Sequence, residues 1–252
     1  MQPVLEVKHL SKVFGGRRRT KTTAVEDVSF VLGAGECLGI VGESGSGKTT
    51  VADMIACLTA PTEGSVLLDG REITQRKGKE LRQIYKEIQM VFQTPVESFD
   101  PRQKLGDGIG EGLKNQGMSG AAVRKEVERL LSLCGLPASY ADRFPHQVSG
   151  GECQRAAIAR AIAVRPRVLI CDEATSALDA VIQREILLLL SDLKERLRLS
   201  ILFICHDIAL VQTFCDRMLV MHRGRIVEEG IPEEIIHRPK QAYTKKLVDS
   251  IL

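Results

Sequence analysis

The chain has 252 residues and a formal net charge of +3, and 44% of its residues are hydrophobic and 27% charged. This length allows one large or two small domains with a substantial core, and the small charge gives no sign of nucleic acid or an anionic membrane as a partner. No apolar run approaches the roughly 18 residues that span a bilayer, and the N-terminus lacks a signal-peptide core, so work at a membrane would depend on another chain.

Two strands are predicted near the N-terminus. Residues 4–14 alternate apolar and polar side chains as a half-buried strand does, and residues 25–31 repeat this pattern. The basic segment 15–21 between them is typical of an exposed hairpin tip, with weak attraction to phosphates as the alternative. Phe14 lies just before this tip and is either a core residue or a ring that stacks on an adenine base.

A glycine-rich turn occupies residues 42–49. The run 37–41 before it is short and apolar, as in a strand buried on both faces, and residues 51–58 carry apolar side chains at helical spacing. Such a unit binds phosphate through backbone N–H groups and the helix N-terminus, although a flexible Gly/Ser turn is the alternative. Lys48 would reach the β- and γ-phosphates and Thr49 would ligate Mg²⁺. The residues assigned to the nucleotide are Gly42, Glu43, Ser44, Gly45, Ser46, Gly47, Lys48, Thr49 and Thr50.

A further pair of strands is predicted after this unit. Residues 64–70 form a strand closed by a turn, and a charged helical stretch follows it. The apolar strand 88–92 comes next and ends at Gln93. Because the carboxyl ends of parallel strands form the ligand crevice of an open α/β sheet, Gln93 is a candidate site residue.

The next part of the chain changes character and predicts helices. Residues 123–134 form an amphipathic helix that stops at a glycine, and a second helix begins at Ser149. Ser149 and Glu152 fit a capping box, in which each side chain accepts a hydrogen bond from the other's backbone. Gly150 and Gly151 weaken a helix start and favour close approach of a phosphate to its backbone N–H groups.

Two later strands end in ionisable side chains. Asp172 and Glu173 follow the apolar run 168–171, and His206 follows the run 201–205. Asp172 is suited to hold Mg²⁺, directly or through water, and Glu173 to orient and deprotonate the water that attacks the γ-phosphate. His206 is placed either to contact the γ-phosphate and this water or to make a structural hydrogen bond.

The C-terminal part predicts a hairpin over 218–227 and helices over 232–236 and 242–252. The seven cysteines of the chain include no C-x-x-C pair. Three of them lie in strand-like runs and two on predicted helix faces, namely Cys37, Cys171 and Cys205 in strands and Cys57 and Cys134 on helices. We therefore expect buried thiols in a reducing compartment, without a disulfide or a structural metal site.

The motifs described above, and the order in which they follow one another, resemble those of the nucleotide-binding subunit of an ATP-binding cassette (ABC) transporter, over essentially the whole chain. The discriminating motif is the family's signature, here residues 148–152, because kinases and GTPases lack it. The resemblance implies the α/β P-loop NTPase fold of ABC ATPases, with a mixed central sheet, an N-terminal antiparallel β subdomain and an inserted α-helical signature subdomain. The P-loop, Q-loop, signature, Walker B pair, D-loop and switch fall at residues 42–49, 93, 148–152, 172–173, 176–179 and 206.

The resemblance also implies how the chain is divided. We expect a single ABC ATPase domain over residues 1–252. Its RecA-like core, with the antiparallel β subdomain, would take residues 1–97 and 166–230. The helical signature subdomain would take residues 98–165, and a helical tail residues 231–252.

Roles that the residues alone leave open follow from the same resemblance. Phe14 would stack on the adenine of ATP, and Gln93 would join Thr49 and Asp172 around Mg²⁺. In this family two subunits sandwich ATP, with the signature of each facing the P-loop of the other, so hydrolysis would require dimerisation. The residues placed at that interface are Ser149, Gly150, Gly151 and Asp179.

The signature departs from the family's usual Leu-Ser-Gly-Gly-Gln at its two ends, where this chain has Val148 and Glu152. A carboxylate at position 152 would repel phosphate unless the capping box turns it back onto backbone N–H groups. We expect a modest effect on nucleotide contact.

Residues 93–102 and 238–247 resemble the peptide and nickel importer group. This implies a bacterial importer ATPase at the cytoplasmic face of the inner (plasma) membrane. Its partners would be a second ATPase subunit, two transmembrane permease subunits and, indirectly, a substrate-binding protein, but no nucleic acid. A heterodimer is the first expectation, although a homodimer is possible. The end at Leu252, without the longer cysteine-bearing extension of many peptide members, slightly favours nickel or a metal chelate over short peptides.

Other classes remain open. An ABC exporter ATPase is one alternative. An ABC ATPase acting on ribosomes or DNA is another, but such proteins usually carry two cassettes or a long coiled-coil insertion, which this sequence lacks. A non-hydrolysing regulatory cassette would lack the catalytic base, whereas Glu173 is present.

Overall fold

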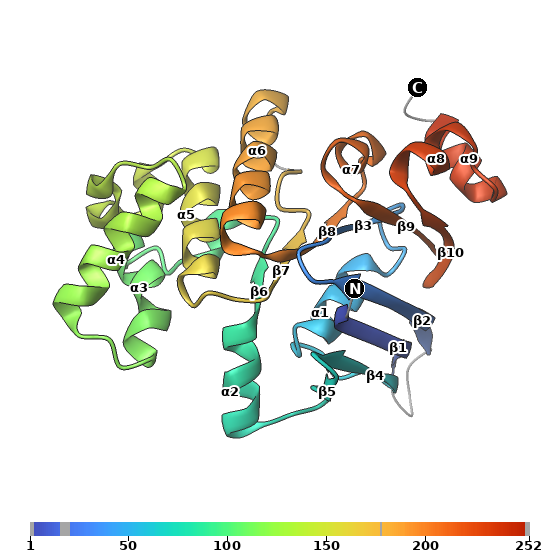
Figure 1. Ribbon diagram of the computed structural model, residues 1–252, viewed down its shortest axis with the longest axis horizontal. Coiled ribbons are helices and arrows are strands. Elements are labelled where there is room, and N and C mark those ends of the chain that lie inside the picture. The colour runs from blue at the N-terminus through green and yellow to red at the C-terminus, as the bar shows by residue number, and fades with distance from the viewer. Residues whose placement is uncertain (1–2, 16–20, 177, 250–252) are drawn as a thin grey trace.

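A computed structural model of the chain describes residues 3–15, 21–176 and 178–249. Figure 1 shows a lobe of helices beside a lobe built on two sheets. The smaller sheet is antiparallel, in the order β2-β1-β4-β5. Its strands are β1 (Pro3–Phe14), β2 (Thr22–Gly33), β4 (Glu63–Leu68) and β5 (Arg71–Glu72).

The central sheet has six strands in the order β10-β9-β3-β8-β7-β6. Only the β9–β10 pair is antiparallel, so the sheet is mixed, which confirms the predicted fold class. Its strands are β3 (Cys37–Val41), β6 (Ile88–Val91), β7 (Val168–Asp172), β8 (Ser200–Cys205), β9 (Arg217–His222) and β10 (Arg225–Gly230).

The helical lobe, at the left of Figure 1, contains α3 (Leu105–Asn115), α4 (Gly120–Leu133) and α5 (Gly150–Ala163). Short 3₁₀ turns cover Pro95–Ser98, Ala138–Asp142 and Pro145–Gln147. The remaining helices surround the sheets. They are α1 (Lys48–Ile55), α2 (Gly78–Glu87), α6 (Ala180–Leu197), α7 (Ile208–Phe214), α8 (Pro232–His237) and α9 (Ala242–Asp249).

Both faces of the central sheet are buried. Successive residues of β3 point to opposite faces, and all five are buried. Leu38 and Ile40 pack with α1 and the small sheet, whereas Cys37 and Val41 pack with α6, α7 and the helical lobe. The core is therefore continuous from the sheet into the helical lobe, and the predicted division at residues 98 and 165 stays a prediction.

Several expected boundaries were wrong. The helix after the glycine-rich turn ends at Ile55, so Leu58 is 51% exposed and Cys57 lies beyond the helix at a positive φ of 57°. Strand β6 ends at Val91, two residues before Gln93. Helices α3, α6 and α7 were not predicted from the sequence. The hairpin tip at 16–20, Ala177 of the D-loop and the end of the last predicted helix at 250–252 lie outside the described residues.

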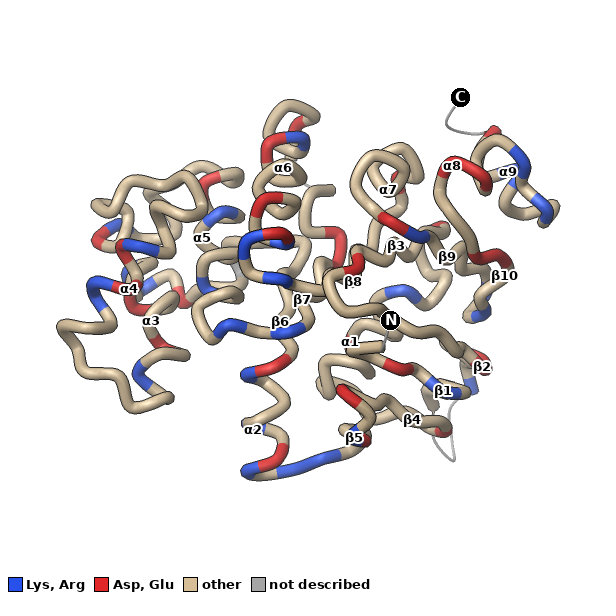
Figure 2. Tube along the Cα trace, in the orientation of Figure 1, with Lys and Arg blue, Asp and Glu red and all other residues tan. Residues whose placement is uncertain are grey.

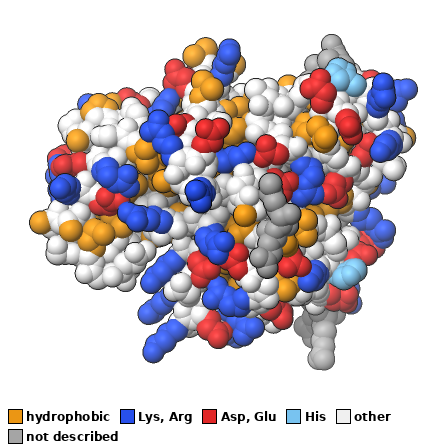
Figure 3. Space-filling view, in the orientation of Figure 1, with side chains coloured by type: hydrophobic (Ala, Val, Ile, Leu, Met, Phe, Trp, Pro, Cys, Tyr) orange, Lys and Arg blue, Asp and Glu red, His pale blue; other side chains and the backbone are white. Residues whose placement is uncertain are grey.

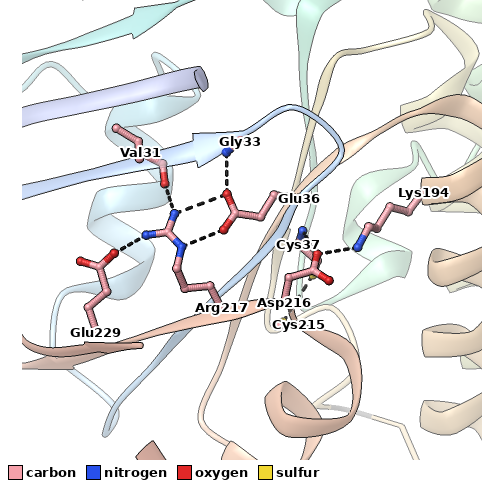
Figure 4. Close-up of polar contacts among 9 residues, drawn as sticks. All are labelled: Val31, Gly33, Glu36, Cys37, Lys194, Cys215, Asp216, Arg217 and Glu229. Atoms are coloured by element: carbon pink, nitrogen blue, oxygen red, sulfur yellow. Dashed lines mark hydrogen bonds and ion pairs between the residues drawn. The ribbon is translucent and has the colours of Figure 1, made fainter. Parts of the chain in front are cut away.

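One guanidinium group ties the two sheets together. Arg217 begins β9, and its Nε lies 2.8 Å from a carboxylate oxygen of Glu36. The same group pairs with Glu229 of β10 and donates a hydrogen bond to the carbonyl of Val31 in β2 (Figure 4). The small sheet is thus fastened to the edge of the central sheet by charge-assisted hydrogen bonds as well as by the core.

Charged side chains are distributed over both lobes. Figure 2 shows Lys and Arg interspersed with Asp and Glu along most elements, and Figure 3 shows Lys and Arg side chains projecting from the region of α2. Within the part of the chain that the structure describes, no helix has the length and apolarity that crossing a bilayer requires.

Candidate nucleotide site

The loop between β3 and α1 is wedged between two neighbouring segments. A Cβ atom on Gly42 would lie 2.1 Å from the carbonyl oxygen of Met221 in β9. A Cβ atom on Gly47, whose φ is 104°, would lie 2.4 Å from the carbonyl oxygen of Ala24 in β2. Glycine at these positions therefore allows close packing of backbone on backbone, and it lets the loop turn into the N-terminus of α1.

Lys48 lies at the centre of this loop and is only 4% exposed. Its ammonium group donates hydrogen bonds to the carbonyl oxygens of Gly42 at 2.7 Å and Glu43 at 2.9 Å. Burial lowers the pKa of Lys48, and the nearby carboxylate of Glu173 opposes this effect. The hydroxyl oxygen of Ser46 is buried without a hydrogen-bond partner in the described part of the protein. The loop thus contains a buried cation and an unsatisfied hydroxyl, and the cation fits a bound phosphate.

The start of α1 and the end of β7 meet at a pair of oxygen-bearing side chains. The Thr49 hydroxyl donates a hydrogen bond of 3.3 Å to Asp172. Burial raises the pKa of Asp172 to about 6, although this hydrogen bond opposes the shift. Asp172 also lines a hollow with Gln93 and Thr94. Hard oxygen donors of this kind suit Mg²⁺, which is bound through one or two carboxylates and the phosphates of a nucleotide.

Glu173 and His206 follow the neighbouring parallel strands β7 and β8. His206 Nδ1 lies 3.9 Å from a carboxylate oxygen of Glu173. Glu173 has a positive φ of 47°, and its backbone N–H donates to the carbonyl of Ile204 at 2.9 Å. Non-glycine residues in this conformation are held by their surroundings and are often found at active sites. The geometry places a carboxylate and an imidazole at the same edge as Lys48.

The signature helix begins as the capping box predicts. Ser149 Oγ accepts a hydrogen bond of 3.3 Å from the N–H of Glu152, and the Glu152 carboxylate accepts one of 2.7 Å from the N–H of Ser149. The same carboxylate accepts a hydrogen bond from the hydroxyl of Tyr140. Because the carboxylate of Glu152 accepts hydrogen bonds from both Ser149 and Tyr140, it points back onto its own chain.

The two signature glycines have different surroundings. A Cβ atom on Gly151 would lie 2.6 Å from Cγ2 of Ile182 in α6, whereas one on Gly150 would meet nothing closer than 3.7 Å. Gly151 is therefore required for the packing of α5 against α6 within this chain. Gly150 leaves its backbone open to approach.

The remaining candidates lie apart from the loop. Asp179 caps α6, its carboxylate accepting hydrogen bonds from the N–H groups of Val181 and Ile182. Phe14 is 46% exposed at the end of β1, and the ammonium of Lys12 lies 5.0 Å from its ring centroid. The structure brings together Lys48, Thr49, Gln93, Asp172, Glu173 and His206, but in the described ranges it gives no hydrogen bond or ion pair between these residues and Phe14, Asp179 or Ser149–Gly151.

Comparisons with known proteins identify the family. The family model described as "ABC transporter" matches residues 25–176. The chain belongs to the ABC transporter family. It is 40% identical to the oligopeptide transport ATP-binding protein OppF of Haemophilus influenzae, over 98% of this chain and 78% of the relative. It is also 40% identical to the dipeptide transport ATP-binding protein DppF of Lactococcus lactis, over 98% of this chain and 81% of the relative.

A solved structure of the same family has the same fold. The dimeric post-hydrolysis state of the ATP-binding cassette MJ0796, bound to ADP and Pi, is 30% identical with a TM-score of 0.82, and covers 90% of this chain and 98% of that chain. The chain is therefore an ABC-type ATPase that binds ATP, as the sequence resemblance implied.

In this ABC ATPase, sequence reasoning missed two residues that contact the site. Arg160 of α5 lies in the wall of the hollow that holds Gln93 and Asp172. Tyr243 of α9 accepts a hydrogen bond of 3.1 Å from the backbone N–H of Glu43. No spacing in the sequence signals either contact, because each joins segments far apart along the chain.

Proposed function

We propose that the chain binds Mg-ATP at residues 42–50 and hydrolyses it as the ATPase subunit of a peptide importer. The observation that carries the proposal is the convergence of Lys48, the Thr49–Asp172 pair and the Glu173–His206 pair at one edge of the central sheet. Peptides are favoured as cargo because the similar oligopeptide and dipeptide ATP-binding proteins carry that cargo in their names. Nickel, which the end of the chain at Leu252 slightly favours, has no such support.

The loop residues would bind and orient the triphosphate. Lys48 would exchange its bonds to the Gly42 and Glu43 carbonyls for phosphate oxygens, and the Ser46 hydroxyl would gain the partner that it lacks. Thr49, Asp172 and Gln93 would hold Mg²⁺. This ion would supply positive charge against the triphosphate.

Glu173 would act on the attacking water. The backbone of Glu173 is held by its N–H bond to Ile204. The Glu173 carboxylate would orient this water and accept its proton, and His206 would hydrogen-bond the γ-phosphate. The left-handed backbone at Glu173 sets the direction in which its side chain leaves the strand end.

The opposite face of the nucleotide would be completed by a second subunit. Ser149, Gly150, Gly151 and Asp179 make no hydrogen bond or ion pair with the loop of their own chain in the described residues, which supports a role toward a nucleotide held by the partner. The bare backbone of Gly150, at the N-terminus of a 14-residue helix, suits a phosphate.

Phe14 would stack on the adenine base of ATP. We propose a heterodimer of ATPase subunits that binds two transmembrane permease subunits at the cytoplasmic face of the membrane.

A groove beside α2 is the candidate surface for a permease. It is lined by residues of α2, α3 and α5, among them Arg82, Lys86, Glu111 and Arg160. Arg160 also lines the hollow that contains Gln93 and Asp172. The Arg160 side chain thus lines both concavities. Movement of a permease in the groove would shift Arg160 and so change the surroundings of the nucleotide.

Uptake measurements test the cargo. We expect a strain in which this chain is replaced by Glu173→Gln to lose uptake of a labelled tripeptide, while the wild-type chain restores it. Loss of ⁶³Ni²⁺ uptake with normal tripeptide uptake would assign the nickel class instead. Normal uptake of both, with the protein recovered only from ribosomes or chromatin, would exclude an importer.

A further inference from the structure

The C-terminal helix contacts the phosphate-binding loop. The hydroxyl oxygen of Tyr243 in α9 accepts a hydrogen bond of 3.1 Å from the backbone N–H of Glu43, although the two residues are 200 positions apart. The Tyr243 ring stacks on His222, the last residue of β9, with ring centroids 3.8 Å apart and planes 27° apart. The tyrosine is therefore held between the loop and the end of a central strand.

The segment before α9 is itself fixed to the central sheet. Glu228 of β10 is 8% exposed, and its carboxylate accepts hydrogen bonds from the backbone N–H groups of Lys240 at 2.9 Å and Gln241 at 3.1 Å. Val248 of α9 is buried in the core. Hydrogen bonds to a charged acceptor are stronger than bonds between neutral groups. The two bonds to Glu228 and the burial of Val248 therefore hold α9, and with it Tyr243, in place without help from the loop.

The backbone of Glu43 joins Tyr243 to Lys48. The Glu43 N–H donates to Tyr243, and the carbonyl of Gly42, in the same peptide group, accepts a hydrogen bond of 2.7 Å from the ammonium of Lys48. The Glu43 carbonyl oxygen accepts a second one of 2.9 Å. The hairpin that follows β9 adds a second support, since the N–H of Gly224 donates to the carbonyl of Ser46 at 2.9 Å. The outer wall of the loop thus consists of β9, its hairpin and the tail.

We infer that Tyr243 is a positioning residue for the nucleotide site: its hydroxyl holds the Glu43 peptide so that the loop and Lys48 keep the geometry that binds phosphate. The inference rests on the proposed nucleotide role of residues 42–50. The C-terminal tail lies outside the P-loop, signature and Walker B motifs, and this inference gives it a function in nucleotide binding. Because Glu43 is exposed, water can partly replace the hydroxyl, so the effect of losing it is graded.

Equilibrium binding of Mg-ATP to the full chain tests this. We expect Tyr243→Phe, which keeps the ring on His222, to weaken binding about two- to tenfold, the range that one net hydrogen bond supports. Tyr243→Ala, which also loses the stacking, should weaken it further. The Glu43 amide should exchange its hydrogen faster in both variants, a change that a role confined to folding of the tail would not produce in Tyr243→Phe. Lys245→Ala, on the exposed side of the same helix, should bind as the wild type does.

Three outcomes overturn the inference. They are unchanged affinity in Tyr243→Phe, an equal loss in Lys245→Ala, and unchanged exchange at the Glu43 amide. Lys48→Ala separates this failure from failure of the proposed function. If Lys48→Ala abolishes binding while Tyr243→Phe does not change it, only the role of Tyr243 is wrong. If Lys48→Ala binds Mg-ATP as tightly as the wild type, the proposed site itself is wrong.

Discussion

The hydroxyl of Thr49 donates a hydrogen bond to Asp172 across 3.3 Å, although 123 positions of sequence separate the two residues. The contact exists because β3, β8 and β7 are parallel neighbours, so the turn after β3 and the end of β7 meet at one edge of the sheet. Asp172 is only 7% exposed at this point. Burial therefore disfavours its charged form, and a bound cation would offset this effect.

The first prediction concerns stability without metal. Burial raises the pKa of Asp172 from its ordinary value of 3.8 to about 6, so between these pH values the folded protein binds a proton that the unfolded chain releases. The contribution of Asp172 to the free energy of unfolding is thus fully present below pH 3.8 and is lost as pH rises through about 6. Asp172→Asn should stabilise the Mg²⁺-free protein at pH 7.5 by about 1–3 kcal/mol, because an amide carries no charge to bury.

Urea unfolding of both proteins in EDTA at pH 4 and pH 7.5 measures this difference. At pH 4 the free energies of unfolding of Asp172→Asn and the wild type should be nearly equal. The same gain at both pH values would show that the substitution acts through packing and not through the charge of Asp172.

The second prediction concerns the proposed base. Glu173→Gln should lower ATP turnover of the assembled transporter about 10²- to 10⁴-fold, the range for loss of a positioned general base, while Mg-ATP affinity changes little. Phosphate release and nucleotide binding measure the two quantities. Glu195→Gln, at an exposed position of α6, is the matched control and should keep wild-type turnover. Unchanged turnover in Glu173→Gln would remove Glu173 from this role.

The third prediction separates the two signature glycines. Gly151→Ala should destabilise the fold by about 1–3 kcal/mol, because its Cβ atom would approach Cγ2 of Ile182 to 2.6 Å. Gly150→Ala meets no atom closer than 3.7 Å and should leave stability nearly unchanged. Ile182→Ala removes the Cγ2 atom that the new methyl group would meet. In a double-mutant cycle, the double variant should therefore lose less free energy of unfolding than the sum of the two single losses. Equal stabilities of the two alanine variants would contradict this explanation.

The fourth prediction concerns Glu152. Glu152→Gln should change ATP turnover by no more than a few-fold, because a glutamine oxygen can accept from the N–H of Ser149 as the carboxylate does. Glu152→Ala should lower the free energy of unfolding by about 0.5–2 kcal/mol through loss of the cap. A large gain of turnover in Glu152→Gln would mean that the carboxylate repels phosphate after all.

Much of the fold could be predicted from local patterns. The run 37–41 and the runs 168–171 and 201–205 are apolar throughout, and the structure places all three in buried parallel strands. Helix α3 was missed because glycine recurs four times between residues 106 and 112, a composition that argues against a helix. These glycines are retained because neighbouring segments pack closely on them, a reason that only the tertiary structure reveals.

The candidate site shows the same limit. Lys48, Thr49, Asp172, Glu173 and His206 each carry a local signal, a glycine-rich turn or a polar residue after an apolar strand, and the structure brings them together. Contacts made across the fold have no such signal. Tyr243 reaches Glu43, and Arg160 joins two concavities, only because of how distant elements are arranged.

The salt bridges of Arg217 bear on any attempt to shorten this chain. A fragment that starts at Cys37 would retain every strand of the central sheet, but it would leave the guanidinium without Glu36 and the Val31 carbonyl. It would also remove Ala24, whose backbone lies against Gly47. The catalytic half thus depends on Ala24, Val31 and Glu36, and we expect a fragment that lacks these residues to be less stable than the full chain.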